Sequence, residues 1–448
     1  LLAESWKLSN DKLEWTFKIR DGVTFSNGHP LTAEAVKKSI ERVFAKNKRA
    51  ESFFKYTSIE ASGQELKIKT KEPVAILPES LADPLFLIVD TSVNTDEFAQ
   101  KGPISTGPFI VQEFKPGEQT VVVRNEKYWN GKAKLAKVTF KDINDQNTRA
   151  LSLKSGEIDV AYNLKVTNKA DFEGDKNIVI NELKSLRSTY AFMNQNKGLK
   201  DKVLREAIIR GANRENYTQN LLQGGATPGK APIPPTLDFG FNELKDENAY
   251  NRESAKKILA DAGYKDVDGD GLRENKDGSK LKITFAARTR DEANESLVQQ
   301  YLNWWKEIGL DVQLYTGRTI ELNSFYDKIQ ADDPEIDVFA AGWSTGYDPN
   351  PEGLFGETAK FNFERYVDPE GTAIMKKISS TEAFDSAKNI EFYKEWQKYV
   401  HDKAFIFPTL VGESITAVNK RVKYYDVNWG SRKSDLYQIE LTSDAAAK

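Results

Sequence analysis

The sequence predicts an α/β fold, and three observations lead to that class. The sequence has a β-rich run at residues 138–140, a helical pattern at residues 147–154 and a second β-rich run at residues 158–160. This alternation is typical of an α/β sheet. The 448 residues correspond to about three structural units of roughly 150 residues each. Hydrophobic residues make up 39% and charged residues 29% of the chain, a balance typical of a large core under a well-solvated surface.

The first part of the chain predicts a strand followed by a helix. Polar and apolar side chains alternate over residues 14–20, with Trp15, Phe17 and Ile19 on one face, as in a half-buried strand. Two glycine-containing pairs then favour turns. The hydroxyl of Thr32 can cap the helix that follows, in which apolar residues recur at helical spacing.

Further elements follow along the chain. Residues 109–111 and 120–123 are two β-rich runs joined by Lys-Pro-Gly-Glu, which predicts a hairpin. Of the neighbouring rings of Trp304 and Trp305 we expect one to face inward. The other predicted helices are residues 201–213, 254–262, 297–308 and 392–400. The other predicted strands are residues 336–341 and 405–408. A proline-rich loop is predicted at residues 224–235.

Charge and composition exclude several functions. The 64 basic and 67 acidic residues give a net charge of −3, without the basic excess that nucleic-acid binding needs. No apolar run approaches the length of about 20 residues that crosses a bilayer. The absence of cysteine excludes disulfides, thiol nucleophiles and thiolate metal sites. Only two histidines, His29 and His401, are present for metal binding or acid–base catalysis.

Five groups of motifs occur in order along the chain. They are residues 2–6 with 15–25 and 28–36, residues 105–109 with 124–129 and 155–160, residues 203–207 with 214–215 and 224–228, residues 255–264, and Gly-Trp at 342–343. Together they resemble the extracellular solute-binding proteins of family 5, the oligopeptide- and dipeptide-binding group. Members of that family carry several tens of residues before the Ala-Glu-Ser-Trp block, so we expect the usual N-terminal segment to be missing here and any targeting segment to lie outside this chain.

The resemblance implies a periplasmic-binding-protein-like, Venus-flytrap fold with two lobes that close on a ligand. On this basis we expect residues 1–104 to form an extra α/β subdomain of lobe I. Lobe I itself would comprise residues 105–188 and 411–448, and lobe II residues 189–410. The chain would cross the hinge within residues 186–191 and 407–410.

The function that the resemblance implies is binding rather than catalysis. We expect an extracytoplasmic protein, on the cell surface through a lipid anchor outside this chain or in the periplasm, that captures short peptides and delivers them to the permease subunits of an ABC transporter. We expect a monomer with no cofactor and no nucleic-acid partner. A saccharide or another small solute remains an alternative ligand, and nickel, which some relatives bind, is disfavoured by the scarcity of histidine.

The most informative candidate site is the segment 342–351, which follows a predicted strand, where α/β proteins bind ligands. In peptide-binding relatives an acidic residue in this loop pairs with the α-ammonium of the ligand, and Asp348 is the nearest match. Several relatives carry the acid two residues earlier, where this chain has Gly346. The aromatic and polar neighbours Trp343, Ser344 and Tyr347 complete this candidate site.

Two other groups of residues are candidates for the ligand cleft. The resemblance places Tyr190, Phe192 and Asn194 at the first hinge crossing, where core packing is the alternative for at least one of them. Arg288 and Arg290 follow a predicted strand and can meet a ligand carboxylate, although exposed arginines are common at protein surfaces.

A function of a different class is that of a serine hydrolase. Residues 342–346 match the Gly-x-Ser-x-Gly pattern around Ser344, and His401 lies downstream. That pattern must lead into a helix, whereas Pro349 and Pro351 prevent a regular one. The sequence therefore disfavours this alternative.

One loop resembles a calcium-binding loop of the EF-hand type. Asp266, Asp268 and Asp270 occupy positions one, three and five, and Glu274 occupies position nine. Position twelve is Asp277 instead of the usual glutamate. The loop is therefore a candidate for weak, structural calcium binding, with a solvated turn as the alternative.

Overall fold

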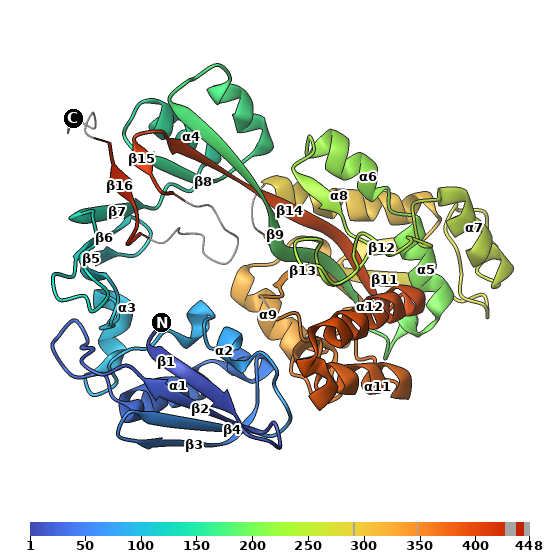
Figure 1. The fold of residues 1–448 in the computed structure, drawn as a ribbon. Helices are drawn as coiled ribbons and strands as arrows, with labels where there is room; N and C mark the ends of the chain where they lie inside the picture. Colours follow the sequence, from blue (N-terminus) through green and yellow to red (C-terminus); the bar gives the residue numbers. More distant parts are fainter. Residues whose placement is uncertain (290–291, 347, 426–435, 443–448) are drawn as a thin grey trace. The chain divides into compact units, whose positions relative to one another are not determined.

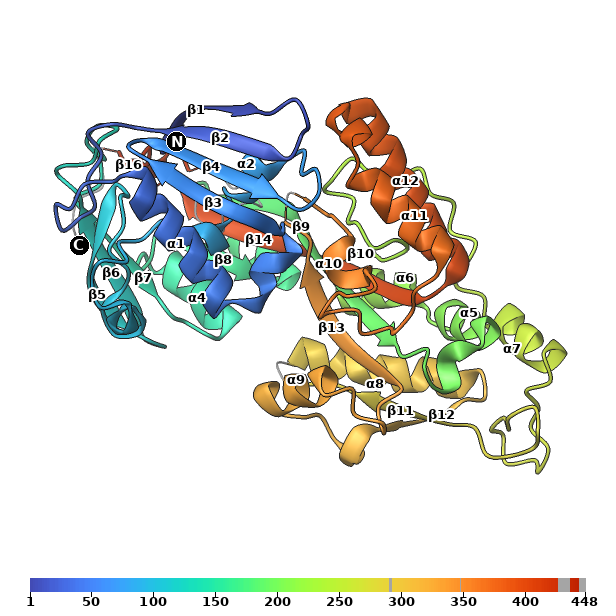
Figure 2. The ribbon, with the colours of Figure 1, turned by 90° about the horizontal axis from the view of Figure 1, so that it is seen from below.

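The computed structural model describes residues 1–289, 292–346, 348–425 and 436–442 (Figures 1 and 2). Contacts divide the chain into unit 1, which comprises Leu1–Leu183, Ser379–Thr381 and Ser414–Lys448, and unit 2, which comprises Lys184–Ile378 and Glu382–Glu413. The chain passes between the units within strand β9 (Ile178–Met193) and within strand β14 (Ile406–Asn419). Among the described residues, none of the helices combines the length and apolar character needed to span a bilayer.

Unit 1 begins with a four-stranded antiparallel sheet in the order β1-β2-β4-β3. The buried side chains of β2 are Trp15, Phe17 and Ile19, as the alternation predicts. Helix α1 (Ala33–Lys46) follows, and the hydroxyl of Thr32 accepts a hydrogen bond from the backbone N–H of Ala35 at 3.1 Å. The strands of this sheet are β1 (Ala3–Leu8), β2 (Glu14–Ile19), β3 (Tyr56–Ser62) and β4 (Glu65–Thr70), and the short helices α2 (Leu77–Ser80) and α3 (Phe98–Lys101) follow it.

The second part of unit 1 contains a three-stranded sheet and a helix–strand pair. The predicted hairpin is confirmed, since β5 pairs antiparallel with β6, and β6 with β7. Strand β8 pairs with the end of β14, where Ile415 and Ala417 complete a core around Leu153 and Ala161. The elements are β5 (Phe109–Lys115), β6 (Gln119–Arg124), β7 (Lys137–Lys141), α4 (Gln146–Lys154), β8 (Val160–Leu164), β15 (Val422–Lys423) and β16 (Glu440–Leu441).

Unit 2 is built on a mixed sheet in the order β10-β14-β9-β13-β11-β12. Strand β11 runs parallel to both β12 and β13, while β13 runs antiparallel to β9. The α/β prediction is therefore confirmed. The strands that enter here are β10 (Ala226–Pro228), β11 (Lys282–Ala286), β12 (Asp311–Leu314) and β13 (Val338–Ser344).

Helices cover both faces of this sheet and create two cores. Helices α5, α7 and α8 contribute to the first core, and α9 to α12 to the second; α11 and α12 lie side by side (Figures 1 and 2). Trp304 and Trp305 are 5% and 0% exposed, so the expectation of a single inward ring was wrong, because α8 is surrounded widely enough to bury both. The helices are α5 (Lys202–Arg210), α6 (Arg214–Asn216), α7 (Arg252–Asp261), α8 (Glu292–Glu307), α9 (Leu322–Gln330), α10 (Glu352–Phe355), α11 (Pro369–Ile378) and α12 (Ser386–Lys403).

The proline-rich loop of unit 2 approaches β14 closely at Gly229. A Cβ added to Gly229 would lie 2.7 Å from the backbone carbonyl group of Pro408 and 3.0 Å from the backbone nitrogen of Leu410. Backbone atoms cannot move aside as the end of a flexible side chain can. The backbone N–H of Gly229 also donates to the carbonyl of Thr409 at 2.9 Å, which fixes the close approach.

In unit 1 a buried carboxylate, Asp90, gathers hydrogen bonds from three side chains. One oxygen lies 2.7 Å from Asn27 Nδ2 and from His29 Nδ1, and the other accepts from the hydroxyl of Ser92 at 2.6 Å and from its backbone N–H at 2.9 Å. Burial alone would raise the pKa of Asp90, but these hydrogen bonds lower it to about 2. The charged carboxylate therefore joins the turn around His29 to the chain at Asp90.

We expect Gly229→Ala to lower the free energy of unfolding by about 1–3 kcal/mol, because the new methyl group collides with the backbone of Pro408. Gly412→Ala, on strand β14, is the matched control, since a Cβ there meets nothing within 4 Å and should change stability by less than about 1 kcal/mol. Chemical denaturation of both variants measures the difference. Equal losses of stability in the two variants would show that the close approach to Pro408 does not exclude a side chain at residue 229.

The Asp90 network should make stability depend on acidity. A carboxylate whose pKa is lower in the folded than in the unfolded chain stabilises the fold above the unfolded pKa of about 3.9, and this contribution disappears as the pH falls towards 2. Asp90→Asn should therefore cost about 2 kcal/mol at pH 6 and progressively less between pH 4 and pH 2. Urea denaturation across this range measures the cost, and a cost that does not change with pH would contradict the assignment.

Candidate functional site

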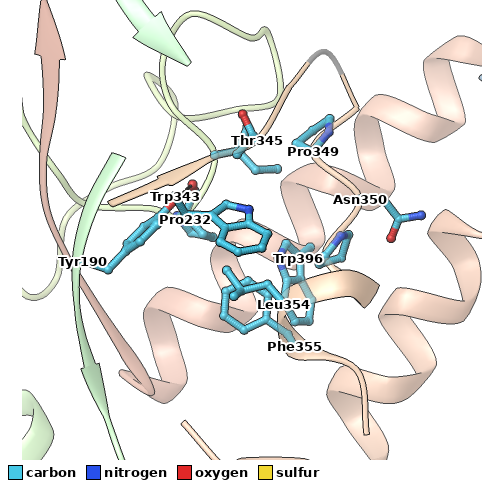
Figure 3. A pocket seen from close by; sticks show the side chains of 11 residues that line it. Tyr190, Pro232, Trp343, Thr345, Pro349, Asn350, Leu354, Phe355 and Trp396 are labelled. Carbon is cyan, nitrogen blue, oxygen red and sulfur yellow. Dashed lines mark hydrogen bonds between the residues drawn. The ribbon is translucent and has the colours of Figure 1, made fainter. Parts of the chain in front are cut away.

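A pocket in unit 2 opens against the face of the sheet that carries the second core. It encloses about 320 Å³ of empty space, part of it open to solvent. Figure 3 shows the indole ring of Trp343 and the ring of Tyr190 beside the proline and aromatic side chains of the surrounding loops and helices. The lining residues are Tyr190, Pro232, Ile233, Trp343, Thr345, Pro349, Asn350, Pro351, Leu354, Phe355 and Trp396.

The pairing of β9 with β13 places the two aromatic walls of the pocket on one face. Trp343 pairs with Ser188, and Ala341 with Tyr190. Because side chains alternate along a strand, all four lie on the same side of the sheet. Ala341 is therefore next to Trp343 on this face of β13 and opposite Tyr190 on β9. The other face of the same strands belongs to the first core.

The hydroxyl of Tyr190 holds the proline-rich loop against the pocket. It donates a hydrogen bond to the carbonyl of Pro232 at 2.5 Å. The next residue, Ile233, donates its backbone N–H to the side-chain oxygen of Gln397 on α12 at 3.0 Å. Burial raises the pKa of the Tyr190 phenol, so the hydroxyl stays protonated and remains a donor. The loop is therefore fixed from both sides.

Asp348 anchors the loop after β13 to α12. One of its carboxylate oxygens accepts a hydrogen bond from the hydroxyl of Tyr393 at 2.9 Å and from the backbone N–H of Asn350 at 3.1 Å. Burial and the neighbouring Asp348 raise the pKa of the Tyr393 phenol, which keeps that donor protonated. The carboxylate therefore has a structural contact, and its pairing with a ligand ammonium stays a prediction.

The structure places the other predicted site residues in different surroundings. Trp343 and Tyr190 line the pocket, Ser344 ends β13, and Gly346 has a φ of 70°, a conformation that glycine adopts without strain. Tyr347 and Arg290 lie outside the described residues.

Three further predicted residues do not line the pocket. Phe192 is 2% exposed and stacks on Phe339 with ring centroids 4.7 Å apart. Asn194 is buried and donates to Asp332 at 3.1 Å. Arg288 is half-buried after β11, where its backbone pairs with that of Ile320. Their roles towards a ligand stay predictions.

The candidate segment 342–351 and Tyr190 account for one side of the pocket, and sequence reasoning missed the other side. Pro232 and Ile233 belong to a segment that the sequence marks only as a loop. Phe355 and Trp396 lie on short and long helices, where apolar spacing predicts core packing. The cluster of prolines beside an aromatic-rich strand is the one signal that points to these segments.

His401 and Ser344, the two residues of the hydrolase alternative, lie on different elements, α12 and β13. His401 is 6% exposed, and its Nε2 lies 3.1 Å from Asp246, which also pairs with the buried Arg214 at 3.1 Å. Although burial opposes it, the hydrogen bond from His401 and the charge of Arg214 keep the pKa of Asp246 below its usual value. In the part of the chain that the structure describes, Ser344 leads into a loop rather than directly into a helix.

In the loop that resembles an EF-hand, the ammonium group of Lys280 lies among the carboxylates. Its Nζ lies 2.6 Å from Asp268, 2.9 Å from Asp270 and 2.8 Å from Glu274. Asp266 accepts backbone N–H groups within the loop, and Asp277 accepts from Ser279. A calcium ion would have to displace Lys280, and calcium binding stays a prediction.

Comparisons with known proteins give the family. Residues 1–365 match the family profile described as "Bacterial extracellular solute-binding proteins, family 5 Middle". The chain is 29% identical to the oligopeptide-binding protein OppA of Lactococcus lactis over 77% of this chain and 60% of that protein. It is 30% identical to the nickel-binding periplasmic protein of Escherichia coli over 91% of this chain and 80% of that protein.

A solved structure supports the same family. The oligopeptide-binding protein AppA of Bacillus subtilis, in complex with a nonapeptide, superposes with a TM-score of 0.83 at 25% identity, over 99% of this chain and 90% of that chain. The predicted family and its two-lobed α/β fold are thus confirmed. Because the profile covers most of the sequence, the chain belongs to the family 5 bacterial extracellular solute-binding proteins, a family of substrate-binding proteins.

Proposed function

We propose that this chain captures short peptides outside the cytoplasm and delivers them to the permease of an ABC transporter. The observation that carries this proposal is the pocket on the β9–β13 face, walled by Trp343, Tyr190, Phe355 and Trp396 and open at one side. Aromatic and proline side chains beside polar groups such as Thr345 and Asn350 suit a part of a peptide, which offers both apolar side chains and a polar backbone. The printed names of OppA and AppA, which are oligopeptide-binding proteins, favour the same ligand class.

The binding mode follows from the same features. A peptide side chain enters the pocket, while the peptide backbone forms main-chain hydrogen bonds, as in strand addition. Binding biases an equilibrium between open and closed states of the two lobes, and only the closed, loaded state docks productively on the permease. The protein acts as a monomer, carried on a lipid anchor outside this chain or held in the periplasm.

A nickel complex is the second candidate ligand, because a nickel-binding protein is among the relatives. The side chains argue for a peptide instead. His29 contacts Asp90, and His401 is buried against Asp246. Neither of the two histidines of this chain is among the residues that line the pocket.

Mass spectrometry of the ligand that copurifies with the protein, released by denaturation, tests the proposal directly. We expect a set of short peptides. A saccharide, a metal chelate, or no ligand together with no binding of peptide pools in calorimetry would contradict it. Because the family profile does not depend on the ligand, such an outcome would change the substrate and leave the family unchanged.

A substitution tests the predicted role of Asp348. Asp348→Asn keeps the size of the side chain but removes its charge, so we expect it to weaken peptides with a free amino terminus by at least about tenfold. Peptides with an acetylated amino terminus should lose much less. Isothermal titration calorimetry with the two matched peptides measures both effects.

Tyr393→Phe is the control for the anchoring contact. It removes the hydroxyl that bonds to Asp348 at 2.9 Å and leaves the carboxylate in place. If Asp348 served only to hold the loop, both variants would weaken free and acetylated peptides equally. That outcome would remove Asp348 from ligand recognition.

A further inference from the structure

The loop between α7 and β11 matches an EF-hand in spacing but not at its last position. In an EF-hand a bidentate side chain at position twelve completes the set of oxygens around calcium. Here position twelve is Asp277, which accepts hydrogen bonds from the hydroxyl of Ser279 at 2.7 Å and from its backbone N–H at 3.0 Å. In the described part of the chain, Asp266, Asp268 and Glu274 bring carboxylate oxygens within 4.8 Å of one another, and Asp277 does not belong to this group. The set of oxygens that calcium prefers is therefore incomplete.

The ammonium group of Lys280 uses all of its donors on the carboxylates of this loop. Its Nζ donates to Asp268 at 2.6 Å, to Asp270 at 2.9 Å and to Glu274 at 2.8 Å. A lysine ammonium has three N–H donors and no acceptor, so the three carboxylates equal its donors in number. The distances are those of charge-assisted hydrogen bonds.

Backbone contacts place Lys280 beside these carboxylates. The backbone of Lys280 pairs with that of Glu274 in an antiparallel bridge. The turn between them is closed by the backbone N–H of Asn275, which donates to the carbonyl of Ser279 at 2.8 Å. The side chain of Asn275 also donates to the carbonyl of Lys280 at 3.3 Å. The turn therefore fixes the position of the lysine independently of its side-chain contacts.

Glu274 is the carboxylate of this group that most needs a cation. Its side chain is 2% exposed, whereas those of Asp268 and Asp270 are 49% and 44% exposed. One of its oxygens accepts the backbone N–H of Val267 at 2.9 Å, and the other accepts from Lys280. A buried charge without a counter-charge is costly. Removal of the ammonium therefore leaves a buried carboxylate near two other negative charges.

The arginine next to Glu274 connects this loop to the helices around it. The guanidinium of Arg273 donates to the backbone carbonyls of Tyr264 at 2.6 Å and of Ile308 at 3.0 Å. Tyr264 follows α7, Ile308 follows α8, and both belong to the first core of unit 2. A change in the loop therefore affects the core, and the melting temperature of the protein reports it.

We propose that the ammonium of Lys280 replaces the calcium ion of an EF-hand-like loop, so that the loop keeps its structure without a divalent cation. The ammonium is covalently attached to the chain and is always present. A calcium site in this loop would make the melting temperature rise with the calcium concentration, and an attached ammonium would not. The proposal is independent of the proposed peptide function, because the loop does not contribute to the lining of the pocket.

Calcium titrations of two proteins test the proposal. We expect the wild-type protein to melt at the same temperature, within about 1 °C, in excess EDTA and in millimolar calcium chloride. Lys280→Met keeps the stem of the side chain but removes the ammonium, so it should melt at least about 3 °C lower in EDTA and recover as calcium is added. Stabilisation of the wild-type protein by calcium would overturn the proposal. A variant that melts like the wild-type protein, or that does not respond to calcium, would overturn it as well.

Two further variants locate the effect. Lys282→Met is the matched control, because Lys282 is also an exposed lysine, at the first residue of β11, and its loss should not create a response to calcium. Adding Asp268→Asn to Lys280→Met removes one carboxylate of the loop, so at least about tenfold more calcium should be needed for the same stabilisation. An undiminished response would place the calcium elsewhere in the protein and contradict the proposal.

The chemical reactivity of Lys280 gives a readout on the unaltered protein. Acylation requires the free amine, and the hydrogen bonds to the carboxylates, first of all to Asp268, raise the pKa of Lys280. Although its side chain is 62% exposed, we expect acetic anhydride to modify it at least about tenfold more slowly than Lys282, with or without calcium. Mass spectrometry of proteolytic peptides measures both rates. Equal rates, or a rate for Lys280 that rises when calcium displaces the ammonium, would overturn the proposal.

Discussion

The antiparallel register between β9 and β13 is the constraint on which the candidate site depends. It pairs seven residues of β13 with seven of β9, from Val338 with Met193 to Ser344 with Arg187. Because side chains alternate, this register assigns Phe192, Tyr190 and Ser188 to one core face and Met193 and Ala191 to the other. A shift by one residue would exchange the faces and remove both aromatic walls of the pocket. The contacts of the proline-rich loop with Tyr190 depend on that face.

Local patterns predicted most of the elements, and the structure bears them out where a single segment carries the signal. The alternation around Trp15 and Phe17 gives β2, the hydroxyl of Thr32 caps α1, and the Lys-Pro-Gly-Glu turn joins β5 to β6. Each of these depends on side chains and backbone groups within a few residues of one another. The family also follows from ordered motifs that need no knowledge of packing.

The pocket could be predicted only in part, because its walls come from distant segments. Trp343 and Tyr190 could be predicted from the strand pattern and from the resemblance to the family. Pro232 and Trp396 meet them only through tertiary packing, which the sequence does not reveal. Lys280 gives no signal in the sequence either, because its position among three carboxylates depends on how the loop turns.

The course of β14 has a consequence for how the chain acquires its structure during synthesis. Apart from Ser379–Thr381, unit 2 is one insertion between Leu183 and Ser414. The small core of unit 1 around Ala161 needs Ile415 and Ala417 from the far side of that insertion. A nascent chain leaves the ribosome from its amino terminus, so this core stays incomplete while more than half of the sequence emerges. A core whose first residues are made early is therefore among the last to be finished.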